Sequence, residues 1–126
     1  NDLKHTDAVG SAKGLDRLLR LCSQASVCFD SDKSPIFREN AKILVISPIR
    51  LHPEIAVRRP ESSIAGKYEA STHFAEQFAP VAAKYGAAFL DAAQYAAPPE
   101  TDCVHMDAAA HAALAEAIAA KLRELL

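Results

Sequence analysis

The chain has 126 residues, enough for one domain and too few for two. Half of the residues are apolar, 24% are charged and the net charge is −2, a globular balance without a basic surface for nucleic acid or an anionic membrane. No apolar run approaches the roughly 20 residues of a membrane span, and the N-terminus resembles no secretory leader. The cysteines, Cys22, Cys28 and Cys103, have no metal-binding spacing, so we expect reduced thiols in a cytoplasmic protein.

The first half of the chain predicts a helix, a loop and a strand. The helix is expected from about Asp7, and its apolar stripe at helical spacing is Leu15, Leu18, Leu19 and Cys22. The polar range 31–40 contains a proline and predicts a loop. The apolar residues Ile43 to Ile46 do not alternate with polar ones, which favours a strand covered on both faces, as in a parallel sheet. Pro48 is expected to end this strand.

A basic, proline-containing range, 49–61, follows that strand. We expect a long surface loop at the carboxyl end of the strand, where α/β proteins usually bind ligands. Arg50 and His52 are therefore candidate substrate-binding residues that could line an acyl or leaving-group pocket. A solvated loop without a ligand is an equally good interpretation of the same residues.

The second half predicts two more helices separated by a short strand. One helix is expected from Ser62 or Ser63 to Tyr85, kinked or split by Pro80, with Gly86 as its stop. The range 87–91 predicts a second buried strand, and 92–100 a loop. The final helix is expected over 108–126, with an apolar face formed by Leu114, Ile118, Leu122 and Leu125.

The order of elements is helix, strand, helix, strand, helix, which predicts an α/β fold with a parallel sheet. A fully buried parallel strand needs a neighbour on each side, and the sequence offers only about two strands for three main helices. We therefore expect that further strands of the sheet are missing, and that they precede Asn1.

Asp102 and His105 lie three residues apart on a predicted loop just before the final helix. Asp107 is better placed to cap that helix, so Asp102 is free to accept a hydrogen bond from Nδ1 of His105. Nε2 is then able to take a proton from a hydroxyl group. Alone, the Asp-x-x-His pattern is weak, and it also fits a helix-capping carboxylate next to a surface imidazole.

The other polar candidates are less specific. The amide of Asn1 could donate to a developing oxyanion, although a polar turn is the simpler interpretation. Cys103 is expected to be a small buried thiol rather than a nucleophile. Cys103, His105, Asp107 and His111 match no well-defined metal site. No serine in the chain follows a Gly-Asp pair.

Two short blocks resemble a known family. Asn1-Asp2-Leu3-Lys4 is similar to the end of the Gly-x-Asn-Asp block of SGNH hydrolases, the GDSL esterase/lipase superfamily. Asp102-Cys103-Val104-His105 is similar to the closing Asp-x-x-His block of the same superfamily. The residues of the first block, together with the long loop after Ser47-Pro48, most resemble the arylesterase/acyltransferase branch. The resemblance covers residues 1–126 but only the later part of the family's single domain.

The resemblance implies a C-terminal portion of a flavodoxin-like α/β/α sandwich. It implies that His105 is the catalytic base, that Asp102 orients it, and that Asn1 belongs to the oxyanion hole. The family's nucleophilic serine and its oxyanion glycine lie in blocks that this sequence lacks, so an N-terminal fragment carrying the serine is the expected partner. By the same analogy, a homo-oligomer is plausible.

The expected function is therefore hydrolysis of a small ester of the carboxylesterase or arylesterase type, with acyl transfer as a variant. No metal or organic cofactor is implied, and this chain alone is expected to be inactive. The alternative is a non-catalytic α/β interaction module, in which Asp102 and His105 serve in capping and packing.

Overall fold

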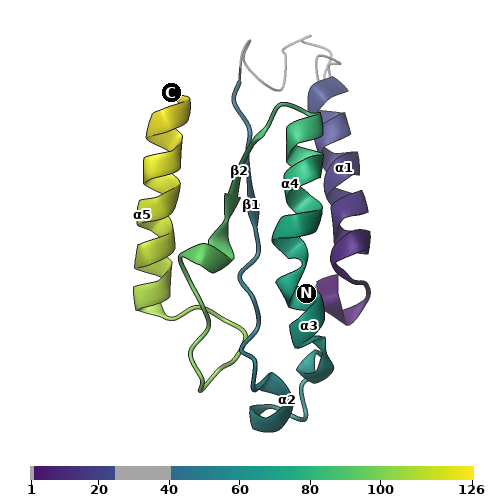
Figure 1. The fold of residues 1–126 in the computed structure, drawn as a ribbon, viewed down its shortest axis with the longest axis vertical. Helices are drawn as coiled ribbons and strands as arrows, with labels where there is room; N and C mark the ends of the chain where they lie inside the picture. Colours follow the sequence, from purple (N-terminus) through teal and green to yellow (C-terminus); the bar gives the residue numbers. More distant parts are fainter. Residues whose placement is uncertain (1, 25–40) are drawn as a thin grey trace, which may run out of the picture.

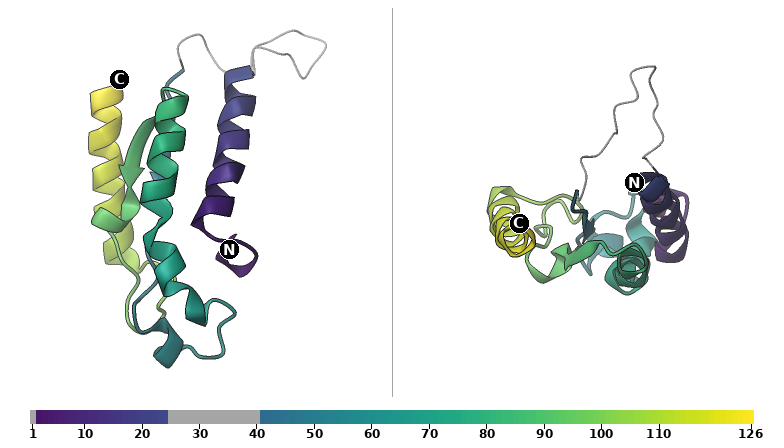
Figure 2. Two further views of the ribbon diagram at one scale, coloured as in Figure 1. Left: turned by 45° about the vertical axis from the view of Figure 1, so that its right-hand side comes forward. Right: turned by 90° about the horizontal axis from the view of Figure 1, so that it is seen from above.

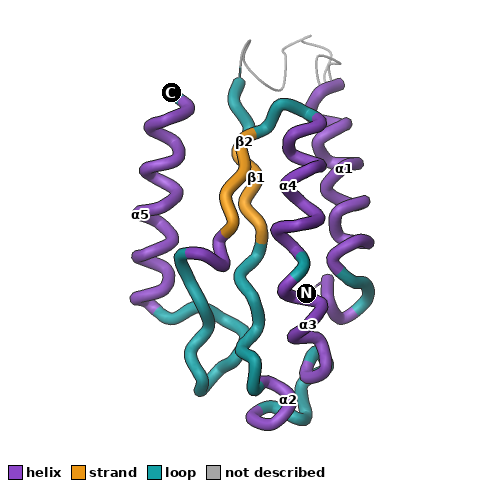
Figure 3. The backbone as a smooth tube through the Cα atoms, viewed as in Figure 1, coloured by secondary structure: helices purple, strands orange, loops and turns teal. Residues whose placement is uncertain are grey.

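The computed structural model describes residues 2–24 and 41–126. These residues contain a parallel sheet of two strands, β1 (Leu44–Ser47) and β2 (Ala88–Asp91), in which Val45 pairs with Phe89. Both strands run towards the same end of the molecule; a loop follows β1, whereas the 3-10 turn Ala92–Gln94 and then a loop follow β2, so the predicted loop at 92–100 begins with a turn of helix (Figure 3). The predicted loop at 31–40 lies outside the described residues.

Helices cover the two faces of this sheet. Helices α1 (Ala8–Gln24) and α4 (Phe74–Lys84) lie on one side, and α5 (Ala108–Leu125) lies on the other (Figures 1 and 2). The layers confirm the predicted α/β class with a parallel sheet and three main helices.

Strand β1 is buried on one face and partly open on the other. Val45 packs with Leu19 of α1 and Ala82 of α4 and is 6% exposed. Ser47, whose hydroxyl donates to Asp91, is 1% exposed, whereas Ile46 is 37% exposed. The expectation that both faces of this strand are covered is therefore wrong at Ile46. The reason is that α5 packs against β2 and leaves part of the neighbouring β1 face open.

Helix α1 starts as predicted, because Oδ1 of Asp7 accepts a hydrogen bond from the amide of Gly10 at 2.8 Å. Its buried face is narrower than expected. Leu19 is 4% exposed and packs with Val45, but Leu18 is 61% exposed. Neighbouring residues of a helix lie about 100° apart around its axis. When Leu19 faces the sheet, Leu18 therefore points away from it.

The range 49–61 is not entirely a loop, because it contains the short helix α2 (Ile55–Arg58). Ile55 is fully buried and belongs to a cluster with Leu51, Phe74 and Cys103. A single turn of helix is too short for hydrophobic periodicity to reveal. Leu51 and Ile55 thus hold the basic segment against the core, next to Cys103.

The helix predicted over 62–85, kinked or split at Pro80, consists of three pieces that are divided elsewhere. A 3-10 turn (Ala65–Lys67) leads into α3 (Tyr68–Thr72), and α4 begins at Phe74. The hydroxyls of Ser71 and Thr72 donate to the carbonyls three residues earlier, at 2.6 and 2.8 Å. Such bonds compete with the backbone donors and bend or weaken a helix, and both lie in the last two residues of α3. The Ser71 hydroxyl also accepts from the Leu51 amide at 3.0 Å, which ties the helix to the segment after β1.

The break in this region was expected at Pro80 and is found at His73 instead. Helix α4 runs through Pro80, although proline cannot donate to the carbonyl of Glu76. Both residues are on the exposed side of the helix, where water can hydrate the carbonyl that lacks a donor.

Gly86 ends α4 as predicted. It has a φ of 66°, its amide donates to the Ala83 carbonyl at 3.1 Å, and the Ala87 amide donates to the Ala82 carbonyl at 3.0 Å. This is the Schellman arrangement, which strongly favours glycine at the left-handed position.

We expect Gly86→Ala to lower the free energy of unfolding by about 1 kcal/mol, because alanine is strained at positive φ. Urea denaturation followed by circular dichroism measures the change. Gly14→Ala is the matched control: Gly14 is an exposed helical residue in α1 with nothing within 4 Å of an added Cβ, so this change is expected to stabilise the protein slightly. Equal effects of the two substitutions would contradict this account.

Candidate active site

The 99–105 turn is built around a buried cysteine in an uncommon conformation. The Pro99 carbonyl accepts hydrogen bonds from the amides of Asp102 and Cys103, at 3.2 and 2.8 Å. Cys103 has a φ of 67°, a left-handed conformation that costs a non-glycine residue about 1 kcal/mol. Its side chain is fully buried, and Sγ donates to the Glu100 carbonyl at 3.1 Å. Cys103 is thus the small buried thiol that the sequence predicts.

The Cys103 side chain lies in the core, whereas the side chains of Asp102 and His105 are more exposed and contact each other. Nδ1 of His105 lies 3.0 Å from Oδ1 and 3.2 Å from Oδ2 of Asp102. Oδ1 also accepts from the Val104 amide at 3.0 Å and from the His105 amide. The imidazole is therefore fixed by one ring nitrogen, while the side chain of His105 is 82% exposed. Among the described residues, Nε2 has no hydrogen-bond partner.

These contacts stabilise the charged form of Asp102. The amide of His105, its imidazole and the Val104 amide lower the pKa of Asp102 from 3.8 to about 2. Because the folded-state pKa is lowered, the contribution of Asp102 to stability is present above its ordinary pKa. It is lost as the pH falls from about 4 through about 2.

We expect a carboxyl ¹³C NMR titration of Asp102 to have its midpoint near pH 2. Over the same interval the amide resonances of Val104 and His105 should move together, because both amides donate to the titrating oxygen. A midpoint at the ordinary value of 3.8 would show that the Asp102–His105 contact does not persist in solution.

Two apolar hollows lie beside the carboxyl end of β1. One, of about 390 Å³, is lined by Leu3, Ile46, Phe74 and Val104 among others. The second, of about 430 Å³, is open and shallow and is lined by residues that include Ile46, Val104, His105 and Leu114. The second hollow places apolar surface directly next to the exposed imidazole. The first brings the beginning of the chain, at Leu3, to the same region.

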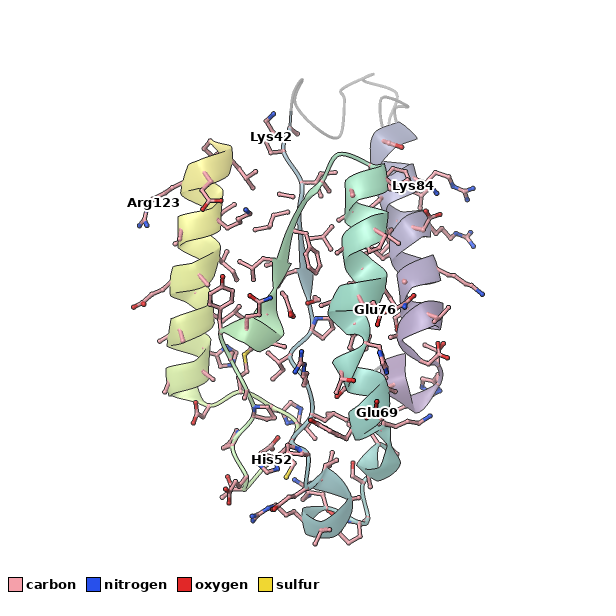
Figure 4. All side chains as sticks on the ribbon, in the orientation of Figure 1. Lys42, His52, Glu69, Glu76, Lys84 and Arg123 are labelled. Atoms are coloured by element: carbon pink, nitrogen blue, oxygen red, sulfur yellow. The ribbon has the colours of Figure 1, made fainter. Side chains whose placement is uncertain are left out.

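The remaining predicted site residues are distributed unevenly. Asn1 lies outside the described residues. Arg50 is exposed, and neither Arg50 nor His52 lines either hollow. His52 lies at the end of the molecule that carries the turn (Figure 4), and its amide donates to the Cys103 carbonyl at 2.9 Å. Its Nδ1 accepts from the Glu54 amide at 3.2 Å, so the ring also contacts the chain that enters α2.

The basic character of the 49–61 segment is largely neutralised by acidic neighbours. Arg58 pairs with Glu54 at 2.6 Å and with Glu100 at 2.9 Å. Arg59 pairs with Glu61 at 2.8 Å, and its Nη1 donates to the Asp102 carbonyl at 3.2 Å. Sequence reasoning noticed these arginines only as local positive charge. Their contacts to the turn could not be inferred from spacing, because the two segments are about 40 residues apart.

No cluster of three or more metal-ligating side chains occurs in residues 2–24 and 41–126. Cys103 and Asp107, which the sequence placed near His105, are used otherwise: Cys103 is buried, and Oδ1 of Asp107 accepts from the Ala110 amide at 2.8 Å to cap α5. The helices in this part of the chain also lack the combination of length and apolarity that crossing a bilayer requires.

No family model and no curated protein matches the chain. Solved structures do match it. One crystal structure shares 35% identity with a TM-score of 0.81, over 100% of this chain and 56% of the other. A putative arylesterase from Agrobacterium tumefaciens str. C58 shares 27% identity with a TM-score of 0.76, over 100% and 57%. A carbohydrate acetylesterase family member from Sinorhizobium meliloti shares 26% identity with a TM-score of 0.75, over 97% and 54%.

The chain therefore has the α/β architecture of the part of these structures that it matches. Its resemblance to SGNH (GDSL-type) esterases is confirmed, and the match extends over essentially its whole length. The chain spans little more than half of the length of the solved structures it matches, which is consistent with a C-terminal portion.

Proposed function

We propose that this chain is the C-terminal part of an SGNH-type serine esterase and supplies the acid–base half of its catalytic triad. The observation that carries the proposal is the pair itself: Nδ1 of His105 lies 3.0 Å from the Asp102 carboxylate, and the imidazole is exposed next to an apolar hollow. The similarity to an arylesterase and a carbohydrate acetylesterase supports the same reaction class.

In this proposal the nucleophile is a serine on a missing or separate N-terminal segment. The serine oxygen bonds to the acyl carbon while its proton passes to Nε2 of His105. The oxyanion is held by Asn1 together with a glycine and a serine amide of the other segment. His105 then protonates the departing alcohol. Water, or another alcohol in acyl transfer, attacks the acyl-enzyme and returns its proton through His105 to the serine.

The same proposal assigns the first hollow and the open edge of β1 to the N-terminal segment. Among the described residues β1 pairs only with β2, so its other edge can pair with a further strand. Ile46 and Leu3 offer apolar surface beside that edge. A strand in this position would end near His105, where the nucleophile is needed. Arg50 and His52 are proposed to lie at the edge of the substrate-binding site, near the acyl or leaving group.

The test separates this chain from its proposed partner. The purified 126-residue chain is expected to leave p-nitrophenyl acetate unhydrolysed. Material isolated from the source cells is expected to contain a second species with a Gly-Asp-Ser block, and a fluorophosphonate probe should label that species and not this chain. Hydrolysis by this chain alone, abolished by His105→Ala, would overturn the proposal.

The competing function, a non-catalytic interaction module, predicts a different environment for His105 and a different composition of the purified sample. It uses His105 for packing, whereas the His105 side chain is 82% exposed. It also predicts a single stable monomer of this length with no associated fragment. Intact mass measurement and gel electrophoresis of the native sample distinguish the two.

A further inference from the structure

The backbone of the 99–105 turn is held from outside by two donors of the 49–61 segment. The Cys103 carbonyl accepts from the His52 amide at 2.9 Å, and the preceding carbonyl, that of Asp102, accepts from Nη1 of Arg59 at 3.2 Å. Both carbonyls belong to the peptides that flank the left-handed residue. The two donors therefore restrain the backbone next to Asp102, and the orientation of this backbone sets the direction of the Asp102 side chain.

Arg59 is itself held in place. Its Nε donates to Glu61 at 2.8 Å, which leaves the Nη1 end of the guanidinium directed at the turn. Its amide donates to the carbonyl of Ile55, a fully buried residue, at 2.9 Å. The guanidinium is thus connected to the core through the end of α2. A lysine cannot reproduce this arrangement, because one ammonium lacks the planar fork that serves two acceptors.

The left-handed conformation of Cys103 is unfavourable without support, so surrounding contacts must hold it. If the Asp102–Cys103 peptide rotates, the Asp102 carboxylate moves away from Nδ1 of His105, although the residues stay neighbours in the chain. Acid–base pairs tolerate only small displacements of this kind.

We propose that Arg59 is a positioning residue, which holds the Asp102–Cys103 peptide so that the Asp102 carboxylate meets Nδ1 of His105. The expected effect of Arg59 on catalysis rests on the proposed esterase function, whereas its expected effect on the tautomer of His105 does not. When the Asp102 carboxylate accepts from Nδ1–H, neutral His105 is held in the tautomer that carries its proton on Nδ1.

The first test uses the 126-residue chain and no substrate. The ¹⁵N shifts of the His105 ring, measured above the pH at which the ring loses its charge, give the fraction of the Nδ1–H tautomer. Arg59→Met is expected to lower that fraction towards the value of a free imidazole. Arg59→Lys is expected to restore it only partly.

Arg58→Met is the matched control. Arg58 is as exposed as Arg59 and one residue away. It pairs with Glu54 and with the Glu100 side chain of the same turn, but among the described residues it makes no hydrogen bond to Asp102, as Arg59 does. Arg58→Met should leave the fraction of the Nδ1–H tautomer of His105 unchanged. An unchanged fraction in Arg59→Met, or equal changes in both variants, would overturn the proposal. General loss of amide dispersion in Arg59→Met alone would also overturn it, since Arg59 would then serve folding rather than the pair.

The second test measures turnover by the complete esterase on p-nitrophenyl acetate. Arg59→Met is expected to lower kcat by about threefold to tenfold with little change in KM, and Arg58→Met to leave both within twofold. A tautomer change in an enzyme without esterase activity would retain the positioning role and reject the proposed function. Normal tautomer populations with a raised KM would reject the positioning role and retain the esterase.

Discussion

His105→Ala is expected to lower kcat/KM of the complete esterase on p-nitrophenyl acetate by about a thousandfold to a millionfold. In the proposed mechanism Nε2 of His105 both takes the serine proton and protonates the departing alcohol, and the side chain is exposed where a nucleophile can approach it. The loss should appear in kcat, with KM changed little, because the imidazole is proposed to act in the transition state rather than in substrate binding. Initial rates over a range of substrate concentrations separate the two.

His73→Ala is the control for a general effect of removing an imidazole. His73 lies between α3 and α4, is 50% exposed and contacts only Glu69 and Glu76 with its ring nitrogens. Its loss should leave turnover unchanged and stability nearly so. Normal turnover in His105→Ala would show that the base has been assigned to the wrong residue.

Asp102→Asn is expected to lower kcat by about a hundredfold to ten-thousandfold while leaving the turn folded. The asparagine oxygen can still accept from the amides of Val104 and His105, which Oδ1 of Asp102 does now. Its amide nitrogen, however, would donate to Nδ1 of His105 and hold the proton on Nε2, the tautomer that cannot act as a base. Single-turnover kinetics and ring ¹⁵N shifts on the same variant measure the two effects.

Asp102→Ala provides the comparison, because it removes both the turn contacts and the charge. It is expected to disturb the amide resonances of 103–105, which Asp102→Asn should preserve. If Asp102→Asn retains full activity with the tautomer reversed, the carboxylate has no role in orienting the base.

The sequence was most informative where a single physical cause acts locally. Gly86 predicts a left-handed stop and is found at one, and Asp107 predicts a cap for α5 and forms it. The run from Ile43 to Ile46 predicts a parallel strand, and β1 pairs in parallel with β2. The Asp102–His105 contact was predicted because it lies within one turn of chain and needs no knowledge of distant segments.

The errors occur where distant contacts or competing hydrogen bonds decide the outcome. Pro80 is a helix breaker by propensity, yet α4 continues through it on an exposed face, where water can hydrate the carbonyl that lacks a donor. The break at His73 instead follows from hydroxyl groups that bond to carbonyls behind them. Ile55 is fully buried because of where the chain passes, which no pattern in four residues can indicate.

The contacts that shape the candidate site were also missed, for the same reason. The amide of His52 and the guanidinium of Arg59 meet the carbonyls of Cys103 and Asp102 only after the two loops are brought together by the fold. A sequence can show that these groups exist, but not which carbonyl each one reaches. The catalytic roles of Asp102, His105 and Asn1, and that of a separate serine, remain predictions from the family resemblance.

The placement of Cys103 between the acid and the base gives the site a built-in chemical probe. Because its thiol is fully buried, an alkylating reagent can reach it only while the turn is open. The rate of alkylation at this position, resolved by peptide mapping from that at the other cysteines, therefore measures how often the turn opens. A slower rate after the proposed N-terminal segment is added would show that association of the two stabilises the turn that carries Asp102 and His105.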